Sequence, residues 1–231
     1  MKHKVDNAII MAAGMATRFG AISLRCPKAL LEVKGEILIE RQIRQLIEAG
    51  VPKIIIVVGY MKEQFEYLQD KFGVILVENP DYAIRNNHSS IYAAREYLKN
   101  SYICSADNYF LENPFCTQEN ESFYASVYIA GKTNEWCIKT DEKDYIENVT
   151  MGGRDAWIMM GHVFWTAQFS EKFQEILERD YNKEVIKGKL WESVYLDNIS
   201  ELKLKIKKYG PSVIFEFDSL EDLKEFEKKW E

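Results

Sequence analysis

Short apolar runs alternate with amphipathic segments along the first half of the chain. The runs are continuous and rich in β-branched residues, which is typical of strands buried on both faces of a parallel sheet. Between them, apolar residues recur at helical spacing, for example at positions 39, 43, 46 and 47. The predicted strands are Ala8–Ala12, Lys53–Val58, Val74–Val77 and Tyr102–Ser105, and the predicted helices are Ile37–Ala49, Lys62–Phe72 and Ser89–Leu98.

The second half of the chain is less regular. It predicts antiparallel strands near 123–130, 136–140 and 145–149, then two helices, a strand at 213–218 and a terminal helix from Leu220. The stretch from Thr150 to Gly161 shows no clear period and is a candidate for a lid. We therefore expect a Rossmann-like three-layer α/β/α core with a mostly parallel sheet and a small antiparallel lobe, forming a single domain over residues 1–231.

Composition narrows the class of protein without deciding it. Of the 231 residues, 47% are hydrophobic and 13% aromatic, so the chain has ample material for a core. The net charge is −6 and no basic block occurs, which argues against nucleic-acid binding. The four cysteines and three histidines show no metal-ligand spacing. No apolar run approaches the roughly 18 residues of a membrane span. We expect a soluble cytoplasmic protein with reduced thiols.

A glycine-containing loop follows the first predicted strand. Small residues at 12, 13, 14 and 16 let a ligand approach the main chain, and successive amide N–H groups of such a loop can surround phosphate oxygens. Arg18 offers a bidentate phosphate donor, and Lys28 follows Pro27 in the sequence Pro-Lys-Ala-Leu. The loop matches neither the Walker A nor the dinucleotide fingerprint. An ordinary glycine turn with surface cations is the alternative.

Three carboxylates are candidates for a metal site. Asp107 ends a predicted strand at the edge where open parallel sheets bind ligands. Glu216 and Asp218 stand two apart in the strand predicted at 213–218, so strand alternation puts both on one face. Oxygen ligands together with phosphates suit Mg²⁺. The alternatives are an ordinary turn at Asp107 and a helix N-cap at Asp218.

The sequence resembles the sugar-nucleotide pyrophosphorylase and cytidylyltransferase superfamily over nearly its whole length. Within it, the chain is most similar to small bacterial cytidylyltransferases that activate phosphocholine or 2-aminoethylphosphonate. The resemblance implies a nucleotidyltransferase core. The matching segments are Ala12-Ala13-Gly14-Met15-Ala16-Thr17-Arg18, Pro27-Lys28-Ala29-Leu30, Val57-Val58-Gly59-Tyr60, Asn86-Asn87, Ser105-Ala106-Asp107-Asn108, Thr133-Asn134-Glu135-Trp136 and Glu216-Phe217-Asp218-Ser219.

The resemblance assigns roles to residues at the nucleotide end. Asp107 and Asp218 would hold the metal with help from Glu216, and Lys28 and Arg18 would act on the phosphates. The residues implied in nucleotide binding are Ala12, Ala13, Gly14, Met15, Ala16, Thr17, Arg18, Lys28, Asn86, Asn87, Ser89 and Ala106. Of these, Asn86, Asn87 and Ser89 would read cytosine, because an amide both donates and accepts. A helix-capping loop before Ile91 is the alternative for these three.

An amine-bearing acceptor needs aromatic faces and carboxylates. The candidate acceptor residues are Asn134, Glu135, Trp136, Trp191, Glu192 and Asp197. Core packing is the alternative for each tryptophan. Two positions depart from the phosphocholine enzymes, since Leu190 stands where a cage aromatic is expected and Ile129 where a basic residue is expected. A primary amine needs fewer aromatic walls, and this favours 2-aminoethylphosphonate.

The predicted function is a Mg²⁺-dependent cytidylyltransferase that transfers CMP from CTP to 2-aminoethylphosphonate, releasing pyrophosphate. Phosphocholine is the alternative acceptor, and a sugar-1-phosphate nucleotidyltransferase is a more distant alternative. A nucleotide-sensing or scaffold domain is the non-enzyme alternative. We expect only small-molecule partners, with no nucleic acid and no membrane. The chain could also be one module of a longer bifunctional protein.

Overall fold

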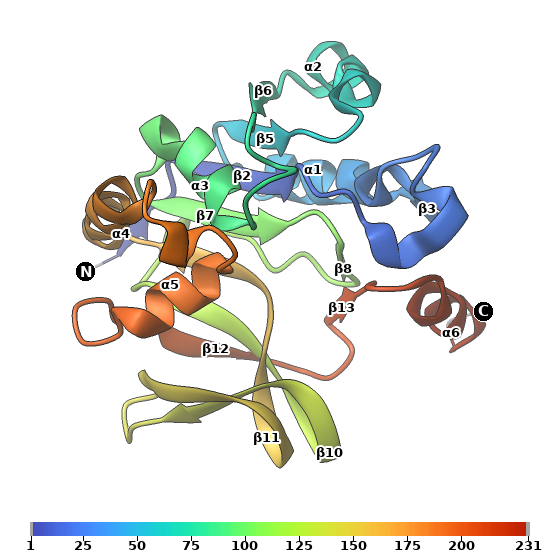
Figure 1. Cartoon of the computed structure of the whole chain (residues 1–231). Helices are drawn as coiled ribbons and strands as arrows, with labels where there is room; N and C mark the ends of the chain where they lie inside the picture. Colours follow the sequence, from blue (N-terminus) through green and yellow to red (C-terminus); the bar gives the residue numbers. More distant parts are fainter. Residues whose placement is uncertain (1, 230–231) are drawn as a thin grey trace.

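The protein is built around one twisted sheet of seven strands (Figure 1). The computed structural model describes residues 2–229. Its strands follow the order β12-β10-β11-β7-β2-β5-β6 across the sheet. They are β2 (Asn7–Ala12), β5 (Ile54–Val58), β6 (Ile75–Glu78), β7 (Ser101–Ser105), β10 (Phe123–Thr140), β11 (Ile146–Trp165) and β12 (Lys205–Tyr209).

The N-terminal half of the sheet is parallel, as the continuous apolar runs predict. β2 lies between β5 and β7, and β6 extends the row beyond β5. All five residues of β5 are buried, because helices cover both faces of this part of the sheet. β11 runs antiparallel to β7 and β10, whereas β12 is parallel to β10. The mostly parallel sheet with an antiparallel extension is therefore confirmed.

Helices pack on the two faces of the sheet and create two apolar cores. Ile10 of β2 faces the core that holds Ile43 of α1, whereas its neighbour Ile9 faces the core that holds Ile91 of α3 and Phe173 of α4. This alternation within one strand gives the three predicted layers. The helices are α1 (Leu38–Glu48), α2 (Tyr67–Phe72), α3 (His88–Ala93), α4 (Ala167–Asp180), α5 (Trp191–Asp197) and α6 (Leu220–Lys229).

Short 3₁₀ helices connect or extend these elements. The helix predicted at 62–72 begins with a 3₁₀ segment and continues as α2. The helix predicted at 89–98 begins as α3 and ends with a 3₁₀ segment. The segments are η1 (Thr17–Ile22), η2 (Lys28–Leu30), η3 (Lys62–Phe65), η4 (Arg95–Tyr97) and η5 (Glu184–Ile186).

Within residues 2–229, three small sheets lie outside the main one. Each contains two antiparallel strands. They pair β1 (His3–Lys4) with β9 (Gln118–Glu119), β3 (Glu32–Val33) with β4 (Glu36–Ile37), and β8 (Asn108–Phe110) with β13 (Ile214–Glu216). The β8–β13 pair matters for function, because it joins the segment after β7 to a segment more than 100 residues later.

The long β10–β11 hairpin corrects the prediction for residues 123–161. The strands predicted at 123–130 and 136–140 are one strand, β10, and the segment 150–161 predicted as irregular lies inside β11. Repeated register shifts between the two strands break the period-two pattern that marks a strand in a sequence. The hairpin also contains Gly131, Gly152 and Gly161, all with positive φ. Glycines within a strand weaken the sequence pattern from which a strand is predicted. Figure 1 shows the hairpin projecting away from the helical layers.

The C-terminal segment partly follows its prediction. The strand predicted at 213–218 ends at Glu216, and α6 begins at Leu220 as expected. Within residues 2–229, no helix has the length and apolar character needed to cross a membrane.

Candidate active site

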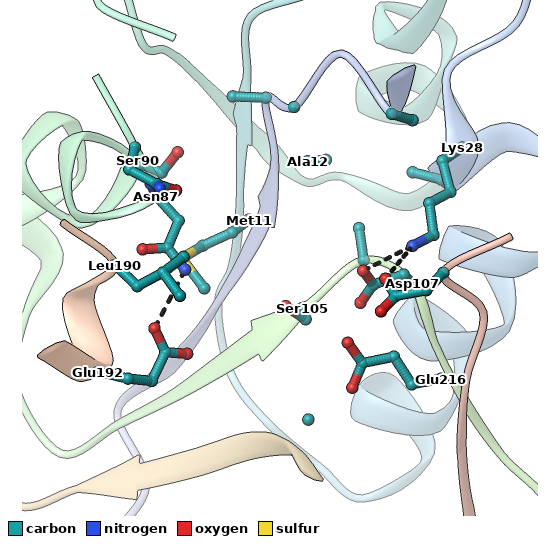
Figure 2. A pocket seen from close by; sticks show the side chains of 18 of the residues that line it. Met11, Ala12, Lys28, Asn87, Ser90, Ser105, Asp107, Leu190, Glu192 and Glu216 are labelled. Atoms are coloured by element: carbon teal, nitrogen blue, oxygen red, sulfur yellow. Dashed lines mark hydrogen bonds and ion pairs between the residues drawn. The ribbon is translucent and has the colours of Figure 1, made fainter. Parts of the chain in front are cut away.

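A cavity of about 650 Å³ opens beyond the carboxyl ends of β2 and β7 (Figure 2). This is the edge at which open α/β sheets bind ligands. Most of the residues predicted from the sequence to form the site line this cavity. They are Ala12, Ala13, Gly14, Ala16, Arg18, Lys28, Asn86, Asn87, Ser89, Ala106, Asp107, Glu135, Trp136, Glu192, Glu216 and Asp218.

The loop after β2 forms one wall of the cavity. Ala16 adopts a left-handed conformation that turns the chain into η1. A Cβ built on Gly14 would meet nothing within 4 Å, so the main chain there faces open space. Met15 and Thr17 belong to the same loop but do not line the cavity. The loop therefore presents backbone and small side chains to a ligand, as its composition predicts.

Lys28 lies among carboxylates at one end of the cavity. Its ammonium is 2.9 Å from Asp107 Oδ2 and 3.3 Å from Asp218 Oδ1. Arg18 reaches the same Asp218 oxygen at 2.9 Å from the more exposed rim. Pro27 has a φ of −57° and directly precedes η2, so the lysine side chain starts from a fixed bend. The two predicted phosphate-binding cations thus converge on one point.

Asp107, Glu216 and Asp218 form a cluster in which one carboxylate oxygen from each residue lies within 4.8 Å of the other two. Glu216 is opposite Asn108 in the β8–β13 pair, and Phe217 N–H donates to the Asp107 carbonyl at 3.2 Å. These backbone bonds bring the two distant segments together. Asp218 lies beyond the end of β13, so it joins the cluster through the turn before α6 and not through strand alternation.

The N-terminus of α6 does not use the Asp218 side chain as its cap. The Asp222 carboxylate accepts hydrogen bonds from the main-chain N–H groups of Asp218 and Ser219, and Ser219 Oγ accepts from Asp222 N–H. This reciprocal arrangement is a capping box. It leaves the Asp218 carboxylate available to Arg18 and Lys28.

The electrostatics of the cluster favour a cation. Burial raises the pKa of Glu216 well above its usual value, and the charges of Asp107 and Asp218 raise it further. Asp107 Oδ1 is buried, and no donor within residues 2–229 forms a hydrogen bond with it. An unpartnered buried carboxylate oxygen is costly unless a ligand completes it. Three clustered carboxylates with such an oxygen fit Mg²⁺, which prefers oxygen ligands.

The opposite end of the cavity is built around Glu192 and Asn87 (Figure 2). Asn87 Nδ2 and Tyr124 OH each donate to the Glu192 carboxylate at 3.3 Å. Asn87 Oδ1 accepts from Trp191 N–H at 2.7 Å, which fixes the start of α5. Burial raises the pKa of Glu192 to about 7, so this carboxyl is only partly ionised at neutral pH.

The Asn86 and Ser89 side chains line the cavity, but their polar atoms already have partners. Asn86 Nδ2 donates to the Gly188 carbonyl at 3.2 Å, and Asn86 Oδ1 accepts from Asn87 N–H. Ser89 Oγ donates to the Asn86 carbonyl and accepts from Asn79. These contacts agree with the alternative for Asn86 and Ser89, a helix-capping loop before Ile91. The Asn87 side chain forms no capping hydrogen bond at the N-terminus of α3.

Three predicted acceptor residues lie away from the cavity. Trp191 is 2% exposed and stacks on Tyr124 inside the core, with ring centroids 5.7 Å apart. Asp197 is exposed on α5 and pairs with Lys189, and Asn134 is exposed on β10. The structure thus supports the core-packing alternative for Trp191 and keeps Trp136, Glu135 and Glu192 at the cavity wall.

Several cavity residues escaped the sequence analysis. Arg85 lines the wall, donates to the Tyr181 carbonyl at 2.7 Å and lies over the Tyr181 ring. Its place directly before Asn86 and Asn87, which the resemblance implicates in nucleotide binding, is the signal that could have identified it. Tyr82, Tyr124 and Met159 also line the cavity. No sequence motif marks these three residues as part of a site.

A cavity at this edge of a mostly parallel sheet, lined by a small-residue loop and clustered carboxylates, is consistent with a nucleotidyltransferase fold. The chain belongs to the family of the MobA-like NTP transferase domain, which matches residues 8–188. The resemblance predicted from the motifs is therefore confirmed.

Relatives of known function cover almost the whole chain. The choline-phosphate cytidylyltransferase of Streptococcus pneumoniae is 38% identical, with 96% of each chain aligned. The 2-aminoethylphosphonate cytidylyltransferase of Lancefieldella rimae is 36% identical over 96% of this chain and 92% of its own length. The solved structure of the CTP:phosphocholine cytidylyltransferase LicC from Streptococcus pneumoniae superposes with a TM-score of 0.94 over 99% of this chain and 100% of that one.

More distant structures share the fold alone. A UDP-glucose pyrophosphorylase complexed with UDP-glucose superposes with a TM-score of 0.77 at 15% identity, over 98% of both chains.

Proposed function

We propose that the chain transfers CMP from CTP to 2-aminoethylphosphonate and releases pyrophosphate. The observation that carries this proposal is a single cavity with two different ends. One end holds Lys28 among three carboxylates, and the other holds the Asn87–Glu192 pair (Figure 2). A phosphate-transfer centre next to a site for an amine is the arrangement this reaction needs. Two relatives of 36% and 38% identity are named as cytidylyltransferases of such acceptors.

The triphosphate would lie against the loop after β2. Main-chain N–H groups of residues 14–17 would donate to the β- and γ-phosphates. Arg18 is largely exposed and would exchange its contact with Asp218 for a bidentate contact with phosphate. Lys28, only 13% exposed, would stabilise the charge that develops on the α-phosphate.

Asp107 and Asp218, assisted by Glu216, would hold Mg²⁺. When bound, the ion would neutralise negative charge on the α-phosphate and on the acceptor oxygen. The unpartnered Asp107 Oδ1 supports this assignment. Glu216, whose pKa is raised by burial and by its two neighbours, would become fully ionised once a cation is present.

The transfer itself would be an in-line displacement. A phosphonate oxygen of the acceptor attacks the α-phosphorus, a new P–O bond forms, and the bond from the α-phosphorus to the bridging oxygen of the β-phosphate breaks. Pyrophosphate leaves with that bridging oxygen. Because the acceptor oxygen is already ionised near neutral pH, no general base is required. Positioning and charge neutralisation by the side chains described above supply the rate enhancement.

The acceptor end supports a primary amine. Leu190 lines the wall where an aromatic would help to enclose a quaternary ammonium, and Trp191 is turned into the core. Trp136 offers an aromatic face, and Glu135 and Glu192 offer carboxylates to a cation. A primary ammonium has three N–H groups that can donate to such acceptors, whereas a trimethylammonium has no N–H group.

Phosphocholine is the second candidate acceptor. It is favoured by the 38% identity to the Streptococcus pneumoniae enzyme and by the TM-score of 0.94 with LicC. Sugar 1-phosphates have weaker support, from a sequence match over 24% of the chain to a UTP--glucose-1-phosphate uridylyltransferase and from the shared fold. A nucleotide sensor without chemistry is disfavoured, because the chain keeps Lys28 and all three clustered carboxylates.

A screen of pyrophosphate release distinguishes these candidates. CTP, UTP and dTTP would each be combined with 2-aminoethylphosphonate, phosphocholine, phosphoethanolamine and glucose 1-phosphate. The proposal expects CTP to be preferred and 2-aminoethylphosphonate to give the highest kcat/KM. A higher value with phosphocholine would replace the acceptor and keep the reaction. Turnover with glucose 1-phosphate alone, or CTP binding without turnover on any acceptor, would overturn the proposal.

A further inference from the structure

Gln42 is a buried polar residue on the inner face of α1, with 1% of its surface exposed. Its Nε2 donates to the carbonyl of Ser105 at 2.8 Å and to the carbonyl of Asn108 at 2.9 Å. Ser105 ends β7 and Asn108 begins β8. Both hydrogens of this one amide are therefore used to join the two ends of the turn that carries Asp107.

The same turn is tied to two other parts of the site. Ala106 N–H donates to the Met11 carbonyl near the end of β2, and the Asp107 carbonyl accepts from Phe217 N–H, each at 3.2 Å. The first bond links the turn to the strand that precedes the phosphate loop. The second links it to the segment that carries the other two carboxylates. Gln42 holds the turn from the opposite side, where α1 packs against it.

The position of this turn decides where the Asp107 carboxylate points. Asp107 Oδ2 contacts Lys28, and Asp107 Oδ1 is the buried oxygen that has no partner within residues 2–229. Metal ligands must be held within about 0.5 Å of their working geometry by the groups behind them. Outer groups that orient ligands typically change metal affinity by about 10- to 100-fold when they are removed.

We propose that Gln42 is a positioning residue for the metal site, which fixes the β7–β8 turn so that Asp107 can bind a divalent cation together with Glu216 and Asp218. The inference rests on the proposed metal-dependent transfer. Gln42 touches neither the cavity nor the carboxylates, so it acts through the main chain of residues 105–108.

Gln45 provides a matched control on the same helix. It is 6% exposed, and its Nε2 also donates to a main-chain carbonyl, that of Phe110, at 3.0 Å. Phe110 is the last residue of β8 and lies outside the turn that carries Asp107. Gln42→Met and Gln45→Met therefore remove the same amide from the same helix while keeping similar volume. Only the first releases the turn.

The test measures metal binding without turnover. Free Mn²⁺ would be titrated by electron paramagnetic resonance against each variant in the presence of α,β-methylene-CTP, whose α–β linkage cannot be cleaved by the transfer. Asp107→Asn shows whether the ion occupies this site. Thermal unfolding of each variant shows how much of any change is general destabilisation. If Gln42→Met gives no folded protein, Gln42→Asn, which draws the amide back by one methylene, replaces it.

Gln42→Met is expected to weaken Mn²⁺ binding by about tenfold or more, and Gln45→Met by less than about twofold. Raising Mg²⁺ should restore most of the kcat of Gln42→Met in the transfer assay, which a merely structural defect would not allow. Equal Mn²⁺ affinities for the two methionine variants would overturn the inference while leaving the metal site intact. Equal affinities for the wild type and Asp107→Asn would instead remove the metal assignment itself.

Discussion

Lys28 and its carboxylate neighbours show how single residues set the chemistry of the site. The ammonium of Lys28 lies 2.9 Å from Asp107 and 3.3 Å from Asp218, where it offsets the charge of an acidic cluster. A divalent ion bound with the nucleotide would neutralise the carboxylates instead, and the lysine would then be free to contact the phosphates. In the proposed mechanism, Lys28 would therefore stabilise the carboxylate cluster before the ligand binds and the transition state afterwards.

Replacing Lys28 with alanine is expected to reduce kcat for pyrophosphate release by about 10²- to 10³-fold, because one donor to developing charge is lost. Steady-state assays at saturating CTP, with circular dichroism as a check of folding, measure this. Lys62→Ala is the matched control, since Lys62 is half exposed, forms an ion pair with Glu78 and does not line the cavity. Near-normal kcat in Lys28→Ala would remove the lysine from the mechanism.

Glu192 predicts a pH dependence. Burial raises its pKa to about 7, so the carboxyl is mostly neutral at pH 6 and mostly ionised at pH 8. A cationic acceptor pairs only with the ionised form. The ratio of wild-type to Glu192→Gln kcat/KM for 2-aminoethylphosphonate should therefore rise about tenfold between these pH values.

The comparison with Glu192→Gln has its own internal control. Ionisation of the phosphonate affects both proteins equally and cancels in the ratio. A ratio that stays flat from pH 6 to pH 8 would show that Glu192 does not bind the acceptor amine.

At the scale of elements, β8, β13 and β11 determine whether the three carboxylates meet. Asn108 on β8 is fully buried, and a Cβ on Gly161 of β11 would lie 2.3 Å from its Oδ1. Gly161 has a φ of +84°, so glycine is needed there both for conformation and for space. The turn carrying Asp107 is thus confined by α1 on one side and by β11 on the other.

Gly161→Ala should destabilise the protein and also lower activity, because Asn108 must move and Asp107 is its neighbour. Gly131→Ala is the matched control, since Gly131 has the same φ of +84° but a Cβ there would meet nothing within 4 Å. The left-handed strain alone should cost about 1–2 kcal/mol in Gly131→Ala, measured by urea unfolding. Equal losses of stability and activity in both variants would contradict this account.

The elements differ in how well the sequence predicts them. β2, β5 and α1 follow their patterns closely, because continuous apolar runs and helical spacing reflect burial directly. β10 and β11 were divided wrongly, because bulges and positive-φ glycines interrupt the alternation. The motifs and the family resemblance singled out Lys28 and three carboxylates, and the structure brings these four residues together. Trp191 was misplaced because an aromatic beside an acid looks the same in a core as in a pocket.

Nothing in the sequence predicts the role that we propose for Gln42. A glutamine on the buried face of an amphipathic helix reads as an interruption of the apolar stripe, and only the turn packed against it shows why it is there. Predicting such a residue requires knowing which carbonyls lack partners, and that depends on long-range packing.

At the scale of the whole molecule, the site joins residues from nearly the full length of the chain. Lys28, Asp107, Glu192 and Glu216 come from four separate parts of the sequence, held on one sheet edge and its flanking elements. A ligand that contacts all of them binds only the folded state. Ligand binding should therefore stabilise the molecule globally.

With α,β-methylene-CTP and Mg²⁺ at about 100 times the dissociation constant, the free energy of unfolding should increase by about 2.7 kcal/mol. Thermal unfolding with and without EDTA measures this. EDTA should remove most of the gain and also abolish pyrophosphate release. Full activity and full stabilisation in the presence of EDTA would contradict the assignment of Mg²⁺ to the carboxylate cluster.

The most direct test of the proposed reaction follows both products at once. ³¹P NMR of the protein with CTP, Mg²⁺ and 2-aminoethylphosphonate should show pyrophosphate and a new phosphonate–phosphate anhydride appearing in equal amounts. Neither product should form with Asp107→Ala. Conversion of CTP to CMP and pyrophosphate without the anhydride, or no loss of CTP with any amine-bearing acceptor, would contradict cytidylyl transfer as the function of this cavity.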